Sequence, residues 1–257
     1  MKEIFLSVVI PCYDEMANLQ KGVLEKVFHF LNKKRFIYEV IVVDDGSKDG
    51  SDEFIENLSK EYPQLILIRN HHTGKAGAVT KGMLVAKGEY RLFTDMDEAT
   101  PIEEIDKLLP YFEKNSPDSK IYDIVIGSRN KKRKGSPLIR QFISRANIVL
   151  RKIIVGLPEI MDTQCGFKMF NKRVAEAIFP KINVIHNGFR HISGSSVTSG
   201  FDVEVLYIAE KMGFTIKEVS VVWLYVESRH VNPIRDSYQG LKDLITIRMN
   251  RLGGKYE

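Results

Sequence analysis

Short apolar runs alternate with helical patterns in the first half of this chain, and this alternation constrains the fold more than any other feature. The apolar runs, each of which predicts a buried strand, are 4–11, 40–44, 65–68, 89–94 and 121–127. The segments with helical spacing are 15–33, 49–62, 75–87 and one that begins near Pro101. Such alternation is typical of an open, mostly parallel sheet with helices on both faces. We therefore expect an α/β fold of the Rossmann-like type.

Length and composition fit a single globular domain. The chain has 257 residues, 44% of them hydrophobic and 28% charged, which argues against disorder. No internal repeat is visible, and the pattern becomes irregular after Gly127. We expect one domain over 1–257, with a nucleotide half at 1–127 and an acceptor half at 128–257.

The net charge and the cysteines indicate where the protein works but do not identify its binding partner. The net charge of +5 suits nucleic acid, anionic lipid or phosphorylated substrates equally. Cys12 and Cys165 lie far apart without metal-ligand spacing, so we predict two buried, reduced thiols. Residues 4–11 are too short and too soon followed by polar residues for a signal peptide, and no stretch approaches the ~20 apolar residues of a membrane span. We expect a cytoplasmic protein that reaches a membrane only peripherally or beside an integral partner.

Two of the predicted strands end in acidic residues. Asp95-Met96-Asp97 follows one apolar run, and Asp44-Asp45-Gly46-Ser47 follows another. The first triplet alone is a weak signal, because short acidic triplets are common on solvated turns. However, parallel strands that end in acidic loops place a nucleotide-diphosphate site at the carboxyl edge of the sheet. Paired carboxylates there suit Mg²⁺ or Mn²⁺, with coordination positions left for substrate phosphates.

The second half contains basic and amphipathic segments. Residues 129–152 include nine Lys and Arg side chains and no acidic one. Residues 138–155 and 234–252 each combine an apolar stripe with basic side chains, a pattern of helices that lie on a membrane surface. Residues 183–200 are rich in Gly, Ser, His and Asn, and we predict a mobile, lid-like loop there.

Several motifs, taken in order, resemble one enzyme family. They are SVVIPCYDE, VIVVDDGSKDGS, GKAGAVTKGMLVAKGEY, FTDMDEAT, IGSR and DTQCGFKMF. Together they resemble the inverting glycosyltransferases of family 2, which have the GT-A fold. DTQCGFK and GFDVEVLYIAEKMGFTIKEVSVVW look most similar to the dolichyl-phosphate β-glucosyltransferases, and next to the dolichyl-phosphate mannosyltransferases. The resemblance covers nearly the whole chain.

This resemblance implies a donor, an acceptor and a metal. The donor would be UDP-glucose or, as second choice, GDP-mannose. The acceptor would be a polyprenyl or dolichyl phosphate at the cytoplasmic face of a membrane. Mg²⁺ or Mn²⁺ would neutralise the departing diphosphate.

The resemblance also assigns nucleotide-binding residues. Pro11, Tyr13 and Glu15 would line the base and ribose pocket, where Tyr13 either stacks on the base or is a surface turn residue. Asp44 would accept the N–H of uracil or guanine, with Asp45 beside it in the same site. A rival role for Asp44, capping the helix at 49–62, is already served by Ser47 and Asp49.

Lys75 and the acidic triplet complete the predicted donor site. Lys75 would touch a phosphate or the ribose near a helix N-terminus, although the chain has no P-loop motif. Asp97 would be the main metal ligand, and Asp95 would touch the ribose or complete the metal's coordination. The lipid-phosphate relatives usually continue D-A-D-L-S/T, whereas here Glu98 follows, and we expect a solvated side chain rather than a third ligand.

Arginines and further carboxylates define the predicted acceptor site. Arg129 and Arg145 would hold the lipid phosphate, because guanidinium groups match phosphate oxygens in pairs. An anionic phosphate needs no general base, so Asp162 would orient Arg or Lys side chains or help hold the metal. For Asp202, a functional role and a first-turn charge on a helix at 203–212 both stay open.

The histidines and the tryptophan give weaker signals. The six histidines show no ligand pattern, and His71, His72, His186 and His191 read as loop residues. Trp223 lies in VSVVWLYV, which predicts an edge or core strand or a contact with the membrane.

Three other functions would each fit part of this sequence. A family 2 enzyme that acts on a saccharide hydroxyl would often carry a Q-x-x-R-W signature, which this chain lacks. A non-enzymatic basic binding protein would use residues 129–152, but no nucleic-acid motif is present, so we expect no nucleic-acid partner. A degenerate sugar-nucleotide binder is disfavoured because Asp44, Asp95 and Asp97 are intact.

Overall fold

A single seven-stranded sheet organises the chain. The computed structural model describes all residues except 1–2, 130–153, 158–159, 190–198 and 225–232. The strands are β1 (Leu6–Cys12), β2 (Tyr38–Asp44), β3 (Leu65–Arg69), β4 (Tyr90–Thr94), β5 (Ile124–Arg129), β6 (Phe167–Asn171) and β7 (Ile216–Val221). Their order is β3-β2-β1-β4-β6-β5-β7, and only β6 runs antiparallel to its neighbours. The predicted mostly parallel α/β sheet is confirmed.

The central strands are apolar because both faces of the sheet are covered. In β1 and β2, Val8 lies opposite Val40 and Val9 opposite Ile41, and all four side chains are buried. A strand buried on both sides has no solvent face for polar residues, so its sequence does not alternate. This explains why the apolar runs located these strands correctly.

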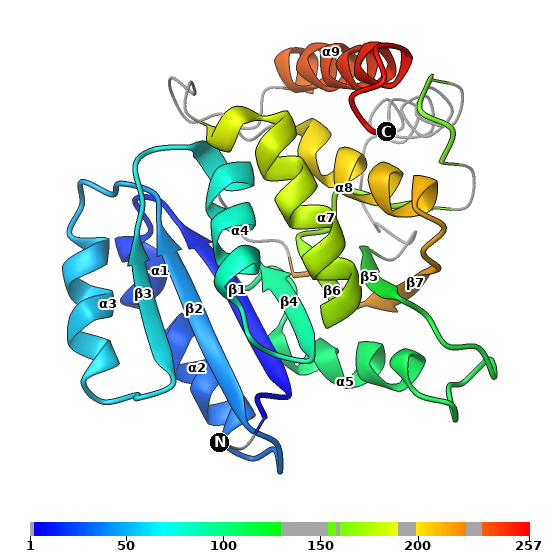
Figure 1. Ribbon diagram of the computed structural model, residues 1–257. Coiled ribbons are helices and arrows are strands. Elements are labelled where there is room, and N and C mark those ends of the chain that lie inside the picture. The colour runs from blue at the N-terminus through cyan, green and yellow to red at the C-terminus, as the bar shows by residue number, and fades with distance from the viewer. Residues whose placement is uncertain (1–2, 130–153, 158–159, 190–198, 225–232) are drawn as a thin grey trace.

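Helices form a layer on each face of the sheet (Figure 1). One face is covered by α4 (Gly74–Val85), α7 (Lys172–Ile185) and α8 (Ser199–Lys211), with α9 (Pro233–Leu252) packed on α8. The other face is covered by α1 (Met16–Leu19), α2 (Val23–Leu31), α3 (Ser51–Ser59) and α5 (Ile105–Leu108). Short 3-10 helices are η1 (Ile102–Glu104), η2 (Leu109–Phe112) and η3 (Asn187–Phe189). Cys12 and Cys165 are buried free thiols.

Several predicted boundaries were wrong. The helix expected at 15–33 is broken into α1 and α2 by Gly22, whose φ of 73° is left-handed. Glycine adopts this conformation without the clash that other residues suffer. The helix expected after Pro101 is divided into η1, α5 and η2.

The second half differs most from expectation. It adds an antiparallel strand, β6, between β4 and β5, and α7 follows at once with Asn171 as its cap, whose Oδ1 accepts the Val174 N–H at 2.9 Å. The predicted helix at 234–252 is confirmed as α9. The loop predicted at 183–200 was wrong over its first part, because α7 reaches Ile185 and η3 buries Phe189 in the core. Residues 190–198, and the amphipathic segment at 138–155 up to residue 153, lie outside the described residues.

Candidate functional site

The predicted donor residues meet at the carboxyl edge of the sheet. Asp44 is the last residue of β2, and its partner in β1 is Cys12, directly before Tyr13. Asp95 follows β4, which also pairs with β1. The loops after three neighbouring parallel strands therefore lie side by side, as in other open α/β sheets with a ligand site.

Asp44 is a buried carboxylate with one oxygen still available. Its Oδ2 accepts backbone N–H groups from Gly46 at 3.1 Å and Ser47 at 3.3 Å. Its Oδ1 is buried and has no hydrogen-bond partner among the residues that the structure describes. An unsatisfied buried acceptor is costly, so a ligand N–H at this point would be stabilising. The N-cap residue of α3 is Gly50, which has no capping side chain, and Asp49 before it accepts the N–H of Ser51, the first residue of the helix, at 3.0 Å.

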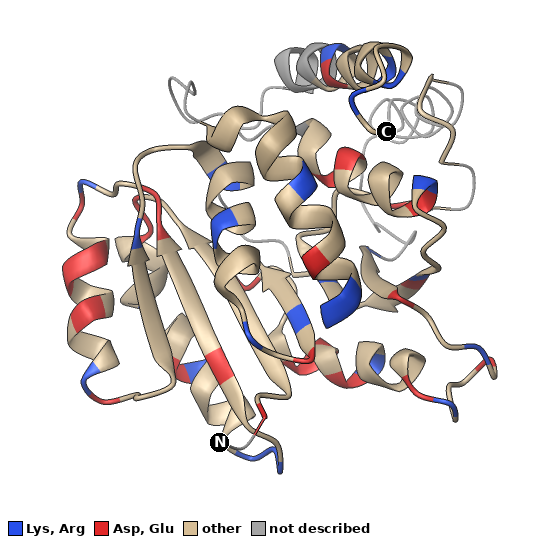
Figure 2. Ribbon diagram, in the orientation of Figure 1, with Lys and Arg blue, Asp and Glu red and all other residues tan. Residues whose placement is uncertain are grey.

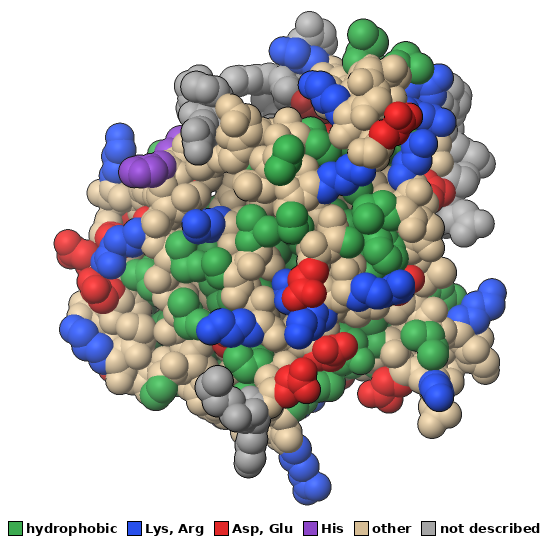
Figure 3. Space-filling model, in the orientation of Figure 1, with side chains coloured by type: hydrophobic (Ala, Val, Ile, Leu, Met, Phe, Trp, Pro, Cys, Tyr) green, Lys and Arg blue, Asp and Glu red, His purple; other side chains and the backbone are tan. Residues whose placement is uncertain are grey.

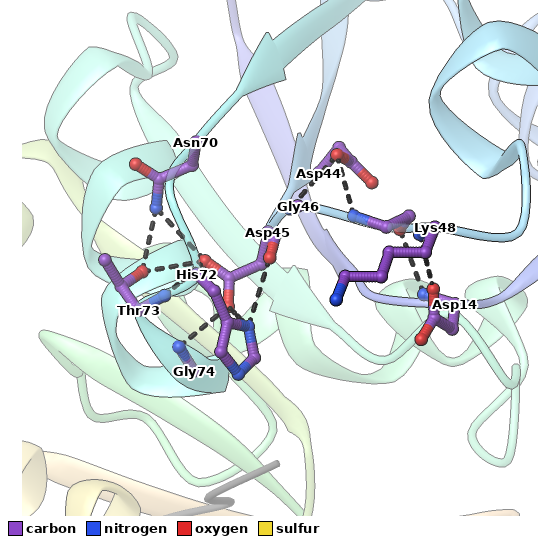
Figure 4. A network of polar contacts seen from close by, with 10 residues as sticks. Asp14, Asp44, Asp45, Gly46, Lys48, Asn70, His72, Thr73 and Gly74 are labelled. Carbon is purple, nitrogen blue, oxygen red and sulfur yellow. Dashed lines mark hydrogen bonds and ion pairs between the residues drawn. The ribbon is translucent and has the colours of Figure 1, made fainter. Parts of the chain in front are cut away.

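Asp45, the adjacent residue, anchors the start of α4 (Figure 4). Its carboxylate accepts the backbone N–H of Thr73 at 2.8 Å and of Gly74 at 2.7 Å, and the Thr73 hydroxyl at 2.8 Å. His72 Nδ1 lies 3.0 Å from Asp45 Oδ2. Both oxygens thus have protein partners, which gives Asp45 a structural role at the start of α4, and its nucleotide contact stays a prediction. It fixes the residues directly before Lys75.

The loop after β1 is tied to the loop after β2. The Asp14 N–H donates to Ser47 Oγ at 2.9 Å, and Asp14 Oδ1 accepts the Lys48 N–H at 2.7 Å (Figure 4). Within this frame the ring of Tyr13 lies 4.4 Å from that of His72, tilted by 32°. The carboxylate of Glu15 accepts Asn18 Nδ2 at 2.6 Å. Pro11 is in β1, opposite Val43, so all three residues predicted for the base and ribose pocket stand near the end of β1.

Lys75 and Asp95 form an ion pair across the site. Lys75 is the second residue of α4, and its Nζ contacts Asp95 Oδ1. Burial alone would lower the pKa of the Lys75 ammonium, but the carboxylates of Asp95 and Asp202 outweigh it and raise that pKa. Lys75 is therefore a fixed positive charge beside the acidic triplet.

Asp97 is half-buried in the same loop as Asp95. Its Oδ1 accepts the Ala99 N–H at 3.0 Å, and burial together with the negative charge of Asp95 raises the pKa of its carboxyl. A cation between the two carboxylates would relieve this repulsion, and their oxygens are the ligands that Mg²⁺ and Mn²⁺ prefer. Among the described residues no third His, Cys, Asp or Glu joins them to form a metal-binding group.

Glu98 was predicted to be solvated, which is wrong. Its side chain is only 16% exposed and pairs with Lys26 of α2 at 3.3 Å. The left-handed backbone of Glu98, with φ of 53°, turns the chain directly after Asp97. This turn directs Glu98 toward α2, so Glu98 fixes the loop to α2.

Arg129 and Asp162 form a two-point ion pair at the end of β5. Arg129 Nε and Nη2 each donate to an Asp162 oxygen at 2.7 Å, and the Arg129 N–H adds a third bond at 3.0 Å. The Arg129 bonds lower the pKa of the Asp162 carboxyl in spite of burial, so the pair stays charged. The expectation that Asp162 orients an arginine agrees with this geometry. Arg145 lies outside the described residues.

Lys168 is a buried charge that sequence reasoning missed. It is fully buried on β6, and its Nζ donates to the Cys165 carbonyl and to Asp202 Oδ1, both at 2.5 Å. Asp202 lies in the first turn of α8, and its charge also raises the pKa values of Lys75 and Arg129. Asp202 therefore does more than stabilise its own helix. The signal was available in the sequence FKMF at 167–170, where a lysine interrupts an otherwise apolar strand segment.

Gly166, in the same motif, permits a close approach. A Cβ atom added at Gly166 would lie 2.1 Å from Asp95 Oδ2, so the Asp95 carboxylate would have to move. The loop at 162–166 therefore packs its backbone against the acidic triplet. The donor carboxylates and the Arg129–Asp162 pair are thus neighbours in one site.

Two of the described histidines lie beside carboxylates. His72 contacts Asp45, and His186 Nε2 lies 2.6 Å from Glu204 Oε2. No group of metal-ligating side chains is found in the part of the chain that the structure describes. His191 lies outside that part.

Comparison with known proteins identifies the family. The model of glycosyl transferase family 2 matches residues 7–179. The chain belongs to this family. It is therefore a glycosyltransferase, and the alternative of a non-enzymatic binding protein falls away. Three similar proteins are named dolichyl-phosphate β-glucosyltransferase. That of Dictyostelium discoideum is 32% identical over 98% of this chain and 76% of its own length, and that of Saccharomyces cerevisiae is 33% identical over 99% of this chain and 77% of its own length. That of Homo sapiens is 31% identical over 98% of this chain and 77% of its own length.

Solved structures agree with the predicted GT-A fold of this family 2 enzyme. Mannosyl-3-phosphoglycerate synthase from Rubrobacter xylanophilus matches with a TM-score of 0.64 and 14% identity, over 98% of this chain and 75% of that one. A mannosyltransferase from Pyrobaculum calidifontis, in complex with GDP-Man and Mn²⁺, matches with a TM-score of 0.56 and 14% identity, over 99% and 75%. At this identity the likeness establishes the fold alone.

Proposed function

We propose that this enzyme transfers glucose from UDP-glucose to a dolichyl or polyprenyl phosphate, at the cytoplasmic face of a membrane. The observation that carries the proposal is the identity of 31–34% to proteins named dolichyl-phosphate β-glucosyltransferase, over nearly the whole chain. GDP-mannose is the second choice of donor. A membrane protein that works beside the enzyme would be a compatible partner.

The donor's base would bind at the end of β1 and β2. The free Oδ1 of Asp44 supports this placement, because it offers an acceptor to the imide N–H of uracil. Pro11, Tyr13 and Glu15 would line the remainder of the base and ribose pocket. Lys75 would move its charge from Asp95 to a phosphate or to the ribose.

A divalent cation, Mg²⁺ or Mn²⁺, would be held by Asp97 and Asp95. The two carboxylates fit such an ion by their oxygen chemistry and by the repulsion that raises the pKa of Asp97. The bound ion would supply charge neutralisation for the diphosphate leaving group. The chain contributes the orientation of the two carboxylates, through the Ala99 N–H and the backbone of Gly166.

The acceptor phosphate would bind to Arg129 and Arg145. One phosphate oxygen attacks the anomeric carbon, the bond from that carbon to the diphosphate breaks, and the electron pair leaves with the nucleoside diphosphate. The configuration is inverted because attack and departure are on opposite sides. The phosphate is anionic, so no carboxylate has to remove a proton, and Asp162 instead holds Arg129 in place.

Helix α9 supports docking on a membrane surface. Leu244 and Ile247 pack into the core, whereas four apolar side chains on another face are exposed: Leu241, Ile245, Met249 and Leu252. Their spacing places them in one stripe. Figure 3 shows hydrophobic side chains beside Lys and Arg over α9. No helix in the described part of the chain is long and apolar enough to cross a bilayer.

We expect no nucleic-acid partner, and of the basic segment 129–152 the structure describes only Arg129. In Figure 2 the basic and acidic residues of the described chain are interspersed, and α3 is acidic. A binding surface for nucleic acid would instead gather basic side chains on one face.

One assay tests the proposal. The protein is incubated with membranes and a panel of radiolabelled nucleotide sugars, and the label is then measured in solvent-extractable lipid. Label from UDP-glucose in a mild-acid-labile lipid is the expected result. If only GDP-mannose gave labelled lipid, the donor would be GDP-mannose instead of UDP-glucose. If the label moved only to a saccharide hydroxyl, the assignment of a lipid acceptor would be wrong.

A further inference from the structure

An exposed apolar triplet lies beside the arginine of the acceptor site. Val222, Trp223 and Leu224 follow β7, and their exposed fractions are 45%, 36% and 51%. Three consecutive large apolar residues at this exposure are unusual unless they meet an apolar partner. We call these three residues the apolar lip.

The apolar lip is held in place by its backbone. The Val222 N–H donates to Glu104 Oε2 at 2.9 Å, and the Leu224 N–H donates to the Ala99 carbonyl at 2.7 Å. Ala99 in turn donates its own N–H to Asp97. The lip is thus joined to the metal-binding loop through two hydrogen bonds, and its exposed side chains are not those of a fraying strand end.

The same triplet touches the predicted phosphate site. The Arg129 guanidinium carbon lies 5.9 Å from the centre of the Trp223 ring, within the range of a cation–π contact. Two nitrogens of this guanidinium are used by Asp162, whereas Nη1 makes no hydrogen bond to any described residue. A cationic donor for a phosphate oxygen and an apolar surface are therefore adjacent.

We propose that the apolar lip binds the first isoprene units of the acceptor, directly beyond the phosphate that Arg129 receives. A molecule with an anionic head and a hydrocarbon tail is the ligand that matches both parts of this surface. The bilayer itself would match the apolar side chains but not the guanidinium that lies beside them. The inference rests on the proposed function and adds a binding subsite for the acceptor's chain.

The composition of the chain provides a direct probe. Trp223 is the single tryptophan among 257 residues, so intrinsic tryptophan fluorescence reports on the lip alone. We would titrate the purified enzyme with farnesyl phosphate below its micelle concentration, in the presence of UDP and Mg²⁺. A saturable blue shift of the emission is expected, because the ring passes from a half-exposed to an apolar environment. Inorganic phosphate should give no shift, and farnesol should need at least about tenfold more ligand than farnesyl phosphate.

Substitutions separate the lip from the general fold. Leu224→Ser keeps the backbone bond to Ala99 but removes apolar surface, and it should raise the concentration for half-maximal shift and the KM for farnesyl phosphate about tenfold. The matched control is Ile121→Ser, which removes a similar, 53% exposed side chain elsewhere and should change neither quantity. Calorimetric binding of UDP should be the same in all three proteins.

The outcomes distinguish the subsite from the function. Transfer to farnesyl phosphate without a shift, or with an unchanged KM in Leu224→Ser, would overturn the subsite and leave the proposed function standing. A saturable shift without any transfer would support the subsite while the proposed function fails. Quenching of Trp223 by brominated lipids in vesicles that contain no polyprenyl phosphate would assign the lip to the bilayer and overturn the proposal.

Discussion

Neighbouring carboxylates at the edge of the sheet differ in their hydrogen bonds, and these bonds separate their roles. Asp44 keeps one buried oxygen without a partner, whereas both oxygens of Asp45 bind the start of α4. Burial and the negative charge of Asp95 raise the pKa of the Asp97 carboxyl, whereas the bonds from Arg129 lower the pKa of the Asp162 carboxyl in spite of burial. Asp44 and Asp97 are therefore the carboxylates that a ligand or a cation would stabilise, and Asp95, which pairs with Lys75, lies beside Asp97 in the same loop.

Asp97→Ala should abolish transfer while the protein stays folded. The loss should be at least about 100-fold, because several kcal/mol of charge stabilisation at the diphosphate disappear. The readouts are the transfer assay and the thermal unfolding temperature, with the exposed Glu53→Ala as control. Activity should also vanish in EDTA and return with Mg²⁺ or Mn²⁺, and full activity in EDTA would refute the metal assignment.

Arg129→Ala should weaken use of the lipid phosphate strongly while donor binding is retained. The KM for the acceptor should rise at least about tenfold, as expected when charge-assisted hydrogen bonds are lost. Arg145→Ala is expected to act in the same way, and Lys132→Ala should shift only the salt dependence. Calorimetry with UDP measures donor binding. An unchanged KM for the acceptor in both arginine variants would exclude the assigned phosphate site.

At the scale of elements, the sequence predicts what is periodic and misses what depends on a distant partner. The apolar runs of β1, β2 and β4 were found because each is buried on both faces. The short strand β6 was missed because it carries the buried Lys168, whose partner Asp202 is 34 residues away and invisible to a local pattern. The division of the helix at Gly22 likewise depends on a backbone angle that spacing does not reveal. The same limit applies to the candidate site, where the sequence placed acidic residues at the strand ends but did not predict the hydrogen bonds of Asp45 to Thr73 and Gly74, which lie 28 and 29 residues away.

The Lys168–Asp202 pair should couple β6 to α8. Lys168→Met leaves Asp202 buried without its partner, which should lower the free energy of unfolding by about 3–5 kcal/mol. The double variant Lys168→Met/Asp202→Leu should regain much of this stability without regaining activity, since the charge of Asp202 near Lys75 and Arg129 is gone. Urea unfolding measures the first effect, with the partly exposed Lys172→Met as control. If the single variant has the same free energy of unfolding as the wild type, the Lys168–Asp202 pair does not stabilise the fold.

At the scale of the whole molecule, α9 carries the surface through which the enzyme would meet a membrane. Replacing Ile245 and Met249 by Glu should reduce binding to anionic vesicles at least about tenfold, because apolar area is lost and repulsion is added. The matched control is Thr246→Glu with Asn250→Glu, which adds the same charge on a different face of the helix. Vesicle co-sedimentation at several salt concentrations is the measurement. If both double variants lost the same amount of vesicle binding, the added negative charge alone would explain the loss, and the apolar stripe would have no role in it.

The antiparallel strand β6 has a consequence for how this protein can be made. Strand β4 pairs with β1 on one side and β6 on the other, and β5 pairs only with β6 and β7. When a ribosome has released the chain as far as Gly127, β4 has an open edge and the first residues of β5 have no partner strand. Open edges invite pairing with other chains. The nucleotide half is therefore expected to need shielding during synthesis until residues 167–171 emerge, and to aggregate if it is expressed alone.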